Sequence, residues 1–275
     1  MVKVKDLVLS GAQKLEGVTE SPRVESRILL AHALSVDVSH IIIHGETEVP
    51  AEKYELFDNL ISMRLKHKPI AYITGKKEFF GLDFYVNEHT LIPRPETEMI
   101  VEEIISSGKK TLLDLCTGSG CIPVAAAKNS GITAVGVDIS SGAVEIATKN
   151  AKAHYLEDKV TFKVADVLKK DLFGRFDIIT SNPPYITEQD MLSISPDVKN
   201  FEPHIALAGG KDGLSFYRRI TEIAPKNLEP DGLLIFEIGI GQGESVAQLM
   251  EKNFTDIKIK KDLAGIDRVV LGRVK

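Results

Sequence analysis

The chain reads FDIITS at residues 176–181 and continues directly into Asn182-Pro183-Pro184-Tyr185. The first six residues form a short apolar run that is typical of a buried strand. The two prolines end that strand, because proline fixes the backbone torsion φ and has no N–H group to donate to a sheet. We expect the turn to hold the asparagine side chain and backbone carbonyls at the carboxyl end of a sheet, where open α/β folds bind ligands.

Similar short apolar segments recur through the second half of the chain. Those with strand character cover residues 111–116, 133–138, 160–165 and 233–238. Helical stretches such as 142–154 and 215–227 lie between them, and residues 257–259 and 268–271 suggest a terminal hairpin. Alternation of strand and helix predicts parallel strands with right-handed crossovers. The predicted fold class is therefore α/β, with a Rossmann-like, mostly parallel sheet.

The first part of the chain has a different pattern. Residues 1–75 carry helical signals, including the N-terminal helix signal Ser21-Pro22, and almost no strand signal. Alternating aromatic and β-branched residues then predict a linking β-hairpin within residues 76–93. We therefore expect a small helical domain over 1–75, which recognises the substrate, the hairpin over 76–93, and a catalytic domain over 94–275.

Composition narrows the classes of function. The 275 residues carry a net charge of −5, which argues against tight, sequence-independent binding of nucleic acid. No apolar run is long enough to span a membrane, and the first residues lack the apolar core of a signal peptide, so a cytoplasmic protein is expected. The two cysteines, Cys116 and Cys121, have no metal-binding or redox spacing, and we expect no metal site.

A glycine-containing loop follows the first predicted strand. It consists of Cys116, Thr117, Gly118, Ser119 and Gly120, and an Ala-rich helix begins directly after it. Glycines let a backbone approach a ligand closely, and the N-terminus of a helix offers free N–H groups. The loop lacks the third glycine of the dinucleotide fingerprint, so it identifies no particular ligand, and a purely structural tight turn remains an alternative.

Acidic residues end the next two predicted strands. Asp138 stands where a carboxylate can accept hydrogen bonds from ribose hydroxyls, and Asp166-Val167 can flank the edge and the face of an adenine ring. Each aspartate has an alternative role as the cap of a following turn. Because the carboxyl ends of parallel strands share one edge of a sheet, these residues are expected to line one site.

Together these features resemble the class I S-adenosylmethionine-dependent methyltransferases. Three further segments, 93–98 (PRPETE), 201–203 (FEP) and 209–214 (GGKDGL), resemble signatures of the HemK/PrmC family. This family methylates the side-chain amide nitrogen (N5) of a glutamine, in the GGQ motif of peptide chain release factors. The resemblance covers nearly the whole chain. It departs from the family at Cys116, where the family usually has the first glycine of the cofactor loop.

The resemblance implies a role for each candidate residue. It implies that S-adenosylmethionine binds to Cys116, Thr117, Gly118, Ser119, Gly120, Asp138, Asp166, Val167 and Asn182. It also implies that Asn182, Pro183, Pro184 and Tyr185 bind the substrate amide, with Asn182, Pro183 and Tyr185 as the catalytic residues. In this scheme the Asn182 side-chain oxygen and the Pro183 carbonyl accept the two amide hydrogens, while the Tyr185 ring packs against the flat substrate group.

Other interpretations stay open on the sequence alone. The first is N-methylation of an exocyclic amine of a nucleic-acid base, since such amines present a similar planar N–H group. The second is a non-catalytic module that senses the cofactor or binds a release factor. Arg94 and Glu96 either pair with each other or border the substrate cleft, and Glu237 has no assigned role.

Overall fold

The computed structural model of the protein describes residues 2–170 and 174–275. The chain forms two compact units. One consists of Met1–Gly75 together with Ser195–Phe201, and the other of Lys76–Ile194 together with Glu202–Lys275. Each unit has its own hydrophobic core.

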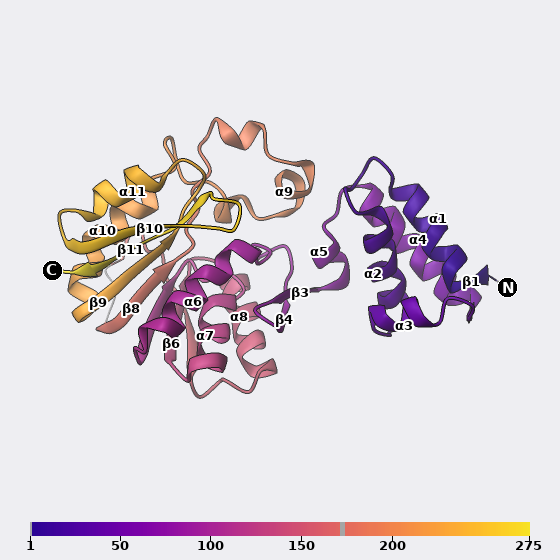
Figure 1. The fold of residues 1–275 in the computed structure, drawn as a ribbon, viewed down its shortest axis with the longest axis horizontal. Helices are drawn as coiled ribbons and strands as arrows, with labels where there is room; N and C mark the ends of the chain where they lie inside the picture. The colour runs from indigo at the N-terminus through magenta and orange to yellow at the C-terminus, as the bar shows by residue number, and fades with distance from the viewer. Residues whose placement is uncertain (1, 171–173) are drawn as a thin grey trace. The chain divides into compact units, whose positions relative to one another are not determined.

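The smaller unit is helical (Figure 1). Its helices are α1 (Val4–Leu15), α2 (Pro22–Leu34), α3 (Val38–Ile43), α4 (Ala51–Leu65), α5 (Ile70–Thr74) and α9 (Pro196–Phe201), and its two short strands are β1 (Val2–Lys3) and β2 (Glu48–Val49). Gly11 of α1 lets the helices approach closely, because a Cβ atom there would lie 2.4 Å from Ser26 Oγ and 2.7 Å from the Phe57 ring. Packing of small against large side chains thus builds this core.

Helix α9 belongs to this unit although it lies 120 residues or more beyond Gly75 in the sequence. The Asp197 carboxylate lies 2.9 Å from Nη1 of Arg64 and 3.0 Å from Nδ1 of His67. Arg64 is buried and also donates from Nε to Glu25 at 2.8 Å. No local sequence signal links residues 195–201 to the amino-terminal helices, so this grouping was not anticipated.

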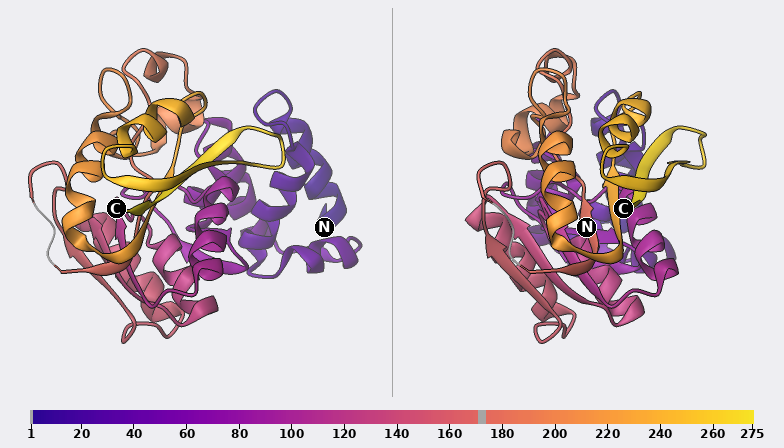
Figure 2. Two further views of the ribbon diagram at one scale, coloured as in Figure 1. Left: turned by 60° about the vertical axis from the view of Figure 1, so that its left-hand side comes forward. Right: turned by 90° about the vertical axis from the view of Figure 1, so that its left-hand side faces the viewer.

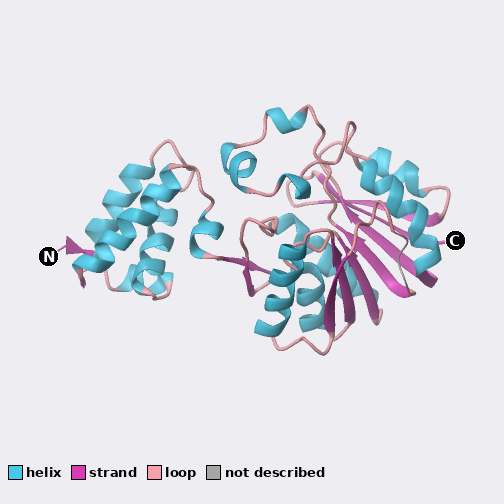
Figure 3. Ribbon diagram, turned by 180° about the vertical axis from the view of Figure 1, so that it is seen from behind, coloured by secondary structure: helices cyan, strands magenta, loops and turns pink. Residues whose placement is uncertain are grey.

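The larger unit is built on a seven-stranded sheet with the strand order β10-β11-β9-β8-β5-β6-β7. The strands are β5 (Thr111–Leu115), β6 (Thr133–Asp138), β7 (Val160–Val164), β8 (Phe176–Ser181), β9 (Leu228–Glu237), β10 (Phe254–Lys261) and β11 (Asp267–Val274). The strands β5 to β9 pair in parallel, whereas β11 runs antiparallel to both β9 and β10. The predicted mostly parallel α/β fold is confirmed, and the strand-and-helix pattern is visible in Figure 3.

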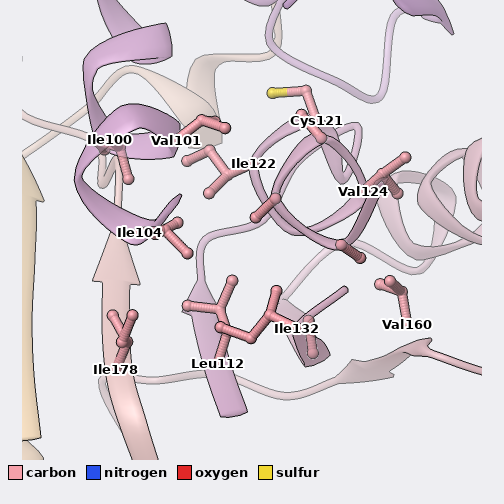
Figure 4. Packing of buried hydrophobic residues seen from close by; sticks show 14 of the residues in the cluster. Ile100, Val101, Ile104, Leu112, Cys121, Ile122, Val124, Ile132, Val160 and Ile178 are labelled. Atoms are coloured by element: carbon pink, nitrogen blue, oxygen red, sulfur yellow. The ribbon is translucent and has the colours of Figure 1, made fainter. Parts of the chain in front are cut away.

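Helices cover both faces of this sheet, as Figure 1 and the two views of Figure 2 show. They are α6 (Glu98–Ser107), α7 (Cys121–Ser130), α8 (Ser141–Ala153), α10 (Ser215–Asn227) and α11 (Gly243–Met250), with the short 3₁₀ helices η1 (Pro95–Thr97), η2 (Asp190–Leu192) and η3 (His204–Ala206). Successive side chains of a strand point to opposite faces, so Leu112 and Leu113 of β5 enter different cores. Figure 4 shows the first core, where Ile100 of α6 and Ile122 of α7 pack over β5 and β8.

A hairpin of β3 (Lys76–Phe79) and β4 (Leu82–Tyr85) begins the larger unit. The sequence pattern suggested a hairpin extending to residue 93, but the strands end at Tyr85. The Asn150 side chain holds Tyr85 at this end, because its Oδ1 accepts from Tyr85 N at 2.8 Å and its Nδ2 donates to Tyr85 O at 3.0 Å. Asn150 belongs to α8, so these two hydrogen bonds connect the last pair of the hairpin, Lys76 with Tyr85, to that helix.

The chain order of the strands creates a switch point between β5 and β8. From β5 the chain proceeds to β6 and β7 on one side, and later from β8 to β9 on the other. Leu115 pairs with Ser181 at this point, so the residues that follow the two strands start next to each other. Open α/β sheets bind ligands at such a crevice. Among the described residues, no helix has the length and apolar character needed to cross a membrane.

Candidate active site

A cavity of about 290 Å³ lies at this switch point. Its wall contains nine of the twelve site residues named from the sequence: Cys116, Thr117, Gly118, Ser119, Asp138, Asp166, Val167, Asn182 and Pro184. The carboxyl ends of β5, β6, β7 and β8 supply all of them. Its volume is close to the lower end of the range for small-molecule sites, roughly 300–1,000 Å³.

The loop after β5 is held in a conformation that suits glycine. Cys116 has a φ of 59°, Gly118 of 54° and Gly120 of 74°, all in the left-handed region. This explains why glycine is the usual family residue at the Cys116 position, since a side chain costs free energy there. Burial raises the pKa of the Cys116 thiol well above its ordinary value, so the group stays neutral.

The two glycines of the loop differ in their surroundings. A Cβ atom on Gly118 would meet nothing within 4 Å, so its backbone faces open space in the cavity. A Cβ atom on Gly120 would lie 2.8 Å from the Phe162 ring and 3.0 Å from Ala147. Gly120 is not part of the cavity wall, and close packing against Phe162 is sufficient reason for a glycine there.

A buried carboxyl group, Asp114, supports this loop from below. Its Oδ1 accepts from Thr180 Oγ1 at 2.7 Å, and its Oδ2 accepts from Thr117 Oγ1 at 2.5 Å. Complete burial raises the pKa of Asp114 to about 7, although the two threonine hydrogen bonds act in the opposite direction. Asp114 thereby connects β5, β8 and the loop, a supporting role that sequence reasoning missed.

Two aspartates, Asp138 and Asp166, stand at the carboxyl ends of β6 and β7 and line the same cavity as the loop. Asp138 Oδ2 accepts from Gly118 N at 2.8 Å, and Oδ1 accepts from Ser140 N at 2.9 Å. Burial raises the pKa of Asp138, against the effect of these backbone hydrogen bonds. Asp166 accepts from Leu168 N at 3.0 Å, so both aspartates also have the turn-capping role that the sequence left open. Val167 is buried beside them.

The turn after β8 presents Asn182 and Pro184 to the cavity, whereas Pro183 and Tyr185 are not part of its wall. Asn182 Nδ2 donates to Thr97 Oγ1 at 3.3 Å. Burial raises the pKa of Tyr185 to about 12, so its hydroxyl is not a base near neutral pH. The Tyr185 ring lies against Gly239, where a Cβ atom would be 3.0 Å from ring atom Cδ2.

Two glycines of the segment 209–214 pack on the backbone of this turn. A Cβ atom on Gly209 would lie 2.7 Å from Tyr185 Cα, and one on Gly213 would lie 2.3 Å from Tyr185 O. Ile186 N also donates to Leu207 O at 2.9 Å, and Gly209 N donates to Ile186 O at 2.9 Å. The GGKDGL signature therefore acts as a backbone support for the turn.

The structure decides the partner of Arg94. Arg94 lines the cavity and forms an ion pair with Glu202, which is buried and also accepts from Ile92 N at 3.1 Å. Arg94 therefore does not pair with Glu96, whose carboxylate lies 3.9 Å from Nη2 of Arg268. Of the two open possibilities, the one in which Arg94 borders the cleft is found, and Glu202 of the FEP signature holds it in place.

Sequence reasoning did not name several other residues of the cavity wall. His89, Leu91 and Pro93 enter from the segment after the hairpin, and Ile205, Ala206 and Phe216 enter from the segment after β8. His89 packs against the start of α8, where a Cβ atom on Gly142 would lie 2.6 Å from the imidazole ring. Only the PRPETE signature gave a partial signal, because it begins at Pro93 next to these residues.

The cavity fits S-adenosylmethionine by its chemistry. Asp138 and Asp166 place carboxylate oxygens along one side, where they can accept from hydroxyl or amino groups. Val167 and Ile139 offer apolar surface beside these carboxylates. Gly118 has no side chain, so a ligand can approach its backbone closely. Asn182 borders the same space from β8. A nucleoside with a polar tail therefore finds hydrogen-bond acceptors, an apolar wall and room in one cavity.

The fold and this cavity define a class I S-adenosylmethionine-dependent methyltransferase. In agreement with this, residues 95–196 match the methyltransferase small domain, and residues 6–75 match the PrmC N-terminal domain. The release factor glutamine methyltransferase of Clostridium acetobutylicum is 40% identical over 98% of this chain and 98% of its own length. The release factor glutamine methyltransferase of Geobacter sulfurreducens is 41% identical over 93% of this chain and 90% of its own length. The chain belongs to the family of release factor glutamine methyltransferases.

Solved structures support the fold alone. The catalytic domain of hMettl16, in complex with the MAT2A 3′UTR hairpin 6, has a TM-score of 0.60 at 17% identity and covers 76% of this chain and 83% of that one. A methyltransferase from Pyrococcus furiosus has a TM-score of 0.57 at 21% identity, and the match covers 78% of this chain and 98% of that one. The family resemblance stated from the sequence is confirmed by the relatives.

Proposed function

We propose that this protein transfers the methyl group of S-adenosylmethionine to the side-chain amide nitrogen (N5) of the glutamine in the GGQ motif of peptide chain release factors. The observation that carries the proposal is the position of Asn182. Its amide side chain borders the cavity beside β5, opposite the carboxylates that follow β6 and β7. Family membership along almost the full chain gives the substrate class.

The chemistry needs alignment more than a strong base. An amide nitrogen is a poor nucleophile, because its lone pair is delocalised into the carbonyl group. When bound, the cofactor supplies an electrophilic methyl group on a sulfonium sulfur. The Asn182 side-chain oxygen and the Pro183 carbonyl accept the two amide hydrogens and thereby direct the nitrogen, and not the oxygen, towards that methyl. Such alignment contributes about 7–11 kcal/mol in well-oriented intramolecular reactions.

The remaining groups have supporting roles in this proposal. Pro183 and Pro184 stiffen the backbone that presents the carbonyl, and the Tyr185 ring packs near the flat substrate group. Asp138, Asp166, Val167 and the loop 116–120 hold the cofactor. The amide proton leaves to water after the carbon–nitrogen bond has formed, when that nitrogen has become acidic.

The helical domain over 1–75 recognises the release factor in this proposal, and the reaction takes place in the cytoplasm. Both cysteines are free thiols, which agrees with a reducing compartment. The net charge of −5 favours a protein substrate over stable binding of nucleic acid. Methylation of a nucleobase is the alternative function, and a labelling assay distinguishes the two.

One labelling experiment tests the proposal. The protein is incubated with methyl-labelled S-adenosylmethionine and either a release factor, the release factor with its GGQ glutamine changed to alanine, or a nucleic acid. We expect label on the unmodified release factor alone. Label that persists in the glutamine-to-alanine factor would overturn the proposed site, and label on the nucleic acid would favour the alternative function.

A further inference from the structure

The orientation of the Asn182 amide is the central requirement of the proposed reaction. An asparagine side chain has a donor end, Nδ2, and an acceptor end, Oδ1, which have nearly the same shape. Only the acceptor end can receive an N–H group of a substrate glutamine. If the amide were rotated by half a turn, two N–H groups would face each other, and the substrate would be repelled.

Thr97 distinguishes the two ends of this amide. Its Oγ1 donates to Glu237 Oε2 at 2.6 Å, and the same oxygen accepts from Asn182 Nδ2 at 3.3 Å. A hydroxyl group has one hydrogen, and the ionised Glu237 carboxylate, which can only accept, takes that hydrogen. While Glu237 is ionised, Thr97 is therefore an acceptor towards Asn182, so Nδ2 faces Thr97 and Oδ1 faces away from it.

The sheet explains why these three residues meet. Ser181 of β8 pairs with Phe236 of β9, so Asn182 and Glu237 occupy neighbouring positions just beyond that pair. Thr97 ends η1, and the following helix α6 packs against β9. Thr97 and Glu237 are 2% and 4% exposed, so little water competes for their hydrogen bond. Glu96, Arg94 and Arg268 are the charged groups whose electrostatic influence reaches the Glu237 carboxyl.

We infer that Thr97 and Glu237 are positioning residues that fix the Asn182 amide with its oxygen towards the substrate glutamine. The inference rests on the proposed function and assigns to it two residues outside the NPPY turn. Thr97 touches Asn182 directly, whereas Glu237 acts through Thr97 by taking its only hydrogen. The relay gives the Asn182 side chain a direction that the turn itself does not provide.

Substitutions of Thr97 test the relay. Thr97→Val keeps the shape but removes the hydroxyl, and we expect kcat with a release factor to fall about 10- to 100-fold, as for other losses of alignment. Thr97→Ser keeps the hydroxyl and should restore turnover to within about threefold of the parent protein, since the same hydrogen bonds can form. Binding of S-adenosylhomocysteine, measured by calorimetry, should be the same in both variants. A Thr97→Val protein with parental kcat would overturn the inference.

Glu237 allows an independent test if Thr97→Val does not fold. Glu237→Gln retains an acceptor oxygen for the Thr97 hydroxyl, whereas Glu237→Leu removes it. We expect Glu237→Leu to lower kcat about 10-fold or more relative to Glu237→Gln. Equal turnover of the two variants would contradict the inference. The matched control is Thr221→Val, because Thr221 is also buried but its hydroxyl donates only to backbone carbonyls of α10.

A double-mutant cycle separates positioning from general stability. If Thr97 acts through Asn182, adding Thr97→Val to Asn182→Ala should change kcat by less than about twofold, because the group to be positioned is already absent. A purely structural role predicts that the two losses multiply. The proposed function and the relay can fail separately. If the parent protein does not methylate a release factor, the proposed function is refuted. If the parent protein is active and Thr97→Val is equally active, only the relay is refuted.

Discussion

The carbonyl oxygen of Tyr185 accepts a hydrogen bond from Nε2 of Gln242 at 3.1 Å, although 57 residues separate the two in sequence. The other end of the same side chain, Oε1, accepts from Gly239 N at 2.9 Å. Gln242 thus connects the turn after β8 with the loop after β9. A donor and an acceptor are both needed at this position, and the uncharged amide supplies both.

Gln242→Glu should therefore loosen the turn. The change keeps the shape but replaces the donor with an oxygen that faces the Tyr185 carbonyl. We expect a loss of about 1 kcal/mol in the free energy of unfolding, because this hydrogen bond is only partly buried, together with lower kcat. Denaturant unfolding and steady-state kinetics measure these two effects. Stability equal to that of the parent protein would show that the hydrogen bond from Gln242 to Tyr185 contributes little to the free energy of unfolding.

Asn182→Ala should reduce turnover and leave the cofactor site intact. The alanine cannot accept an amide hydrogen, so the substrate nitrogen is no longer aligned, and we expect kcat to fall about 100-fold or more. Calorimetry with S-adenosylhomocysteine should give nearly the parental affinity. Turnover close to that of the parent would remove Asn182 from the role proposed for it.

Asp138→Ala should weaken binding of the cofactor. We expect a loss of about 1–3 kcal/mol in binding free energy if the carboxylate accepts hydrogen bonds from ribose hydroxyls. Asp231→Asn is a suitable control, because Asp231 forms exposed ion pairs with Lys109 and Arg273 outside the cavity. Calorimetry on both variants makes the comparison, and unchanged affinity in Asp138→Ala would exclude this placement of the ribose.

Position 116 should tolerate glycine and reject β-branched residues. At a φ of 59° glycine is unstrained, so we expect Cys116→Gly to change the free energy of unfolding by less than about 1 kcal/mol. Cys116→Val should cost about 2 kcal/mol or more, because a β-branched residue is a strong outlier at positive φ. Thermal unfolding and cofactor affinity of the two variants test this. Equal stability of both would contradict the strain argument.

The buried Glu237 carboxyl should make stability depend on pH. Burial raises its pKa to about 7, above the ordinary value of 4.5, so the folded state binds the proton more tightly than the unfolded state. Its contribution to stability is then complete below about pH 4.5 and is lost as the pH rises to about 7, a change on the order of 3 kcal/mol.

Glu237→Gln removes this titration, so the parent protein should lose stability relative to the variant between about pH 4.5 and pH 7. Denaturant unfolding at several pH values gives the difference directly. The buried Asp114, whose pKa is also raised to about 7, is present in both proteins and cancels in the comparison. A constant difference across the pH range would show that Glu237 does not titrate there.

Local patterns in the sequence determined the fold class and most of the cavity wall. The apolar run 176–181 forms a strand whose last four residues are buried, and β8 has the predicted bounds Phe176–Ser181. Residues that directly follow such strands reach the same edge by topology alone, which is why Cys116, Asp138, Asp166 and Asn182 could be placed together.

Only the tertiary structure decided which distant groups support these residues. Thr97 with Glu237, Arg94 with Glu202, and Gln242 with Tyr185 are each separated by more than 50 residues, and no local periodicity encodes such pairs. The register of β8 against β9 and the placement of η1 and α6 bring them together. The sequence by itself determined which residues reach the edge of the sheet, whereas the packing of the whole unit determined how their side chains are oriented, because orientation depends on partners that the fold alone brings near.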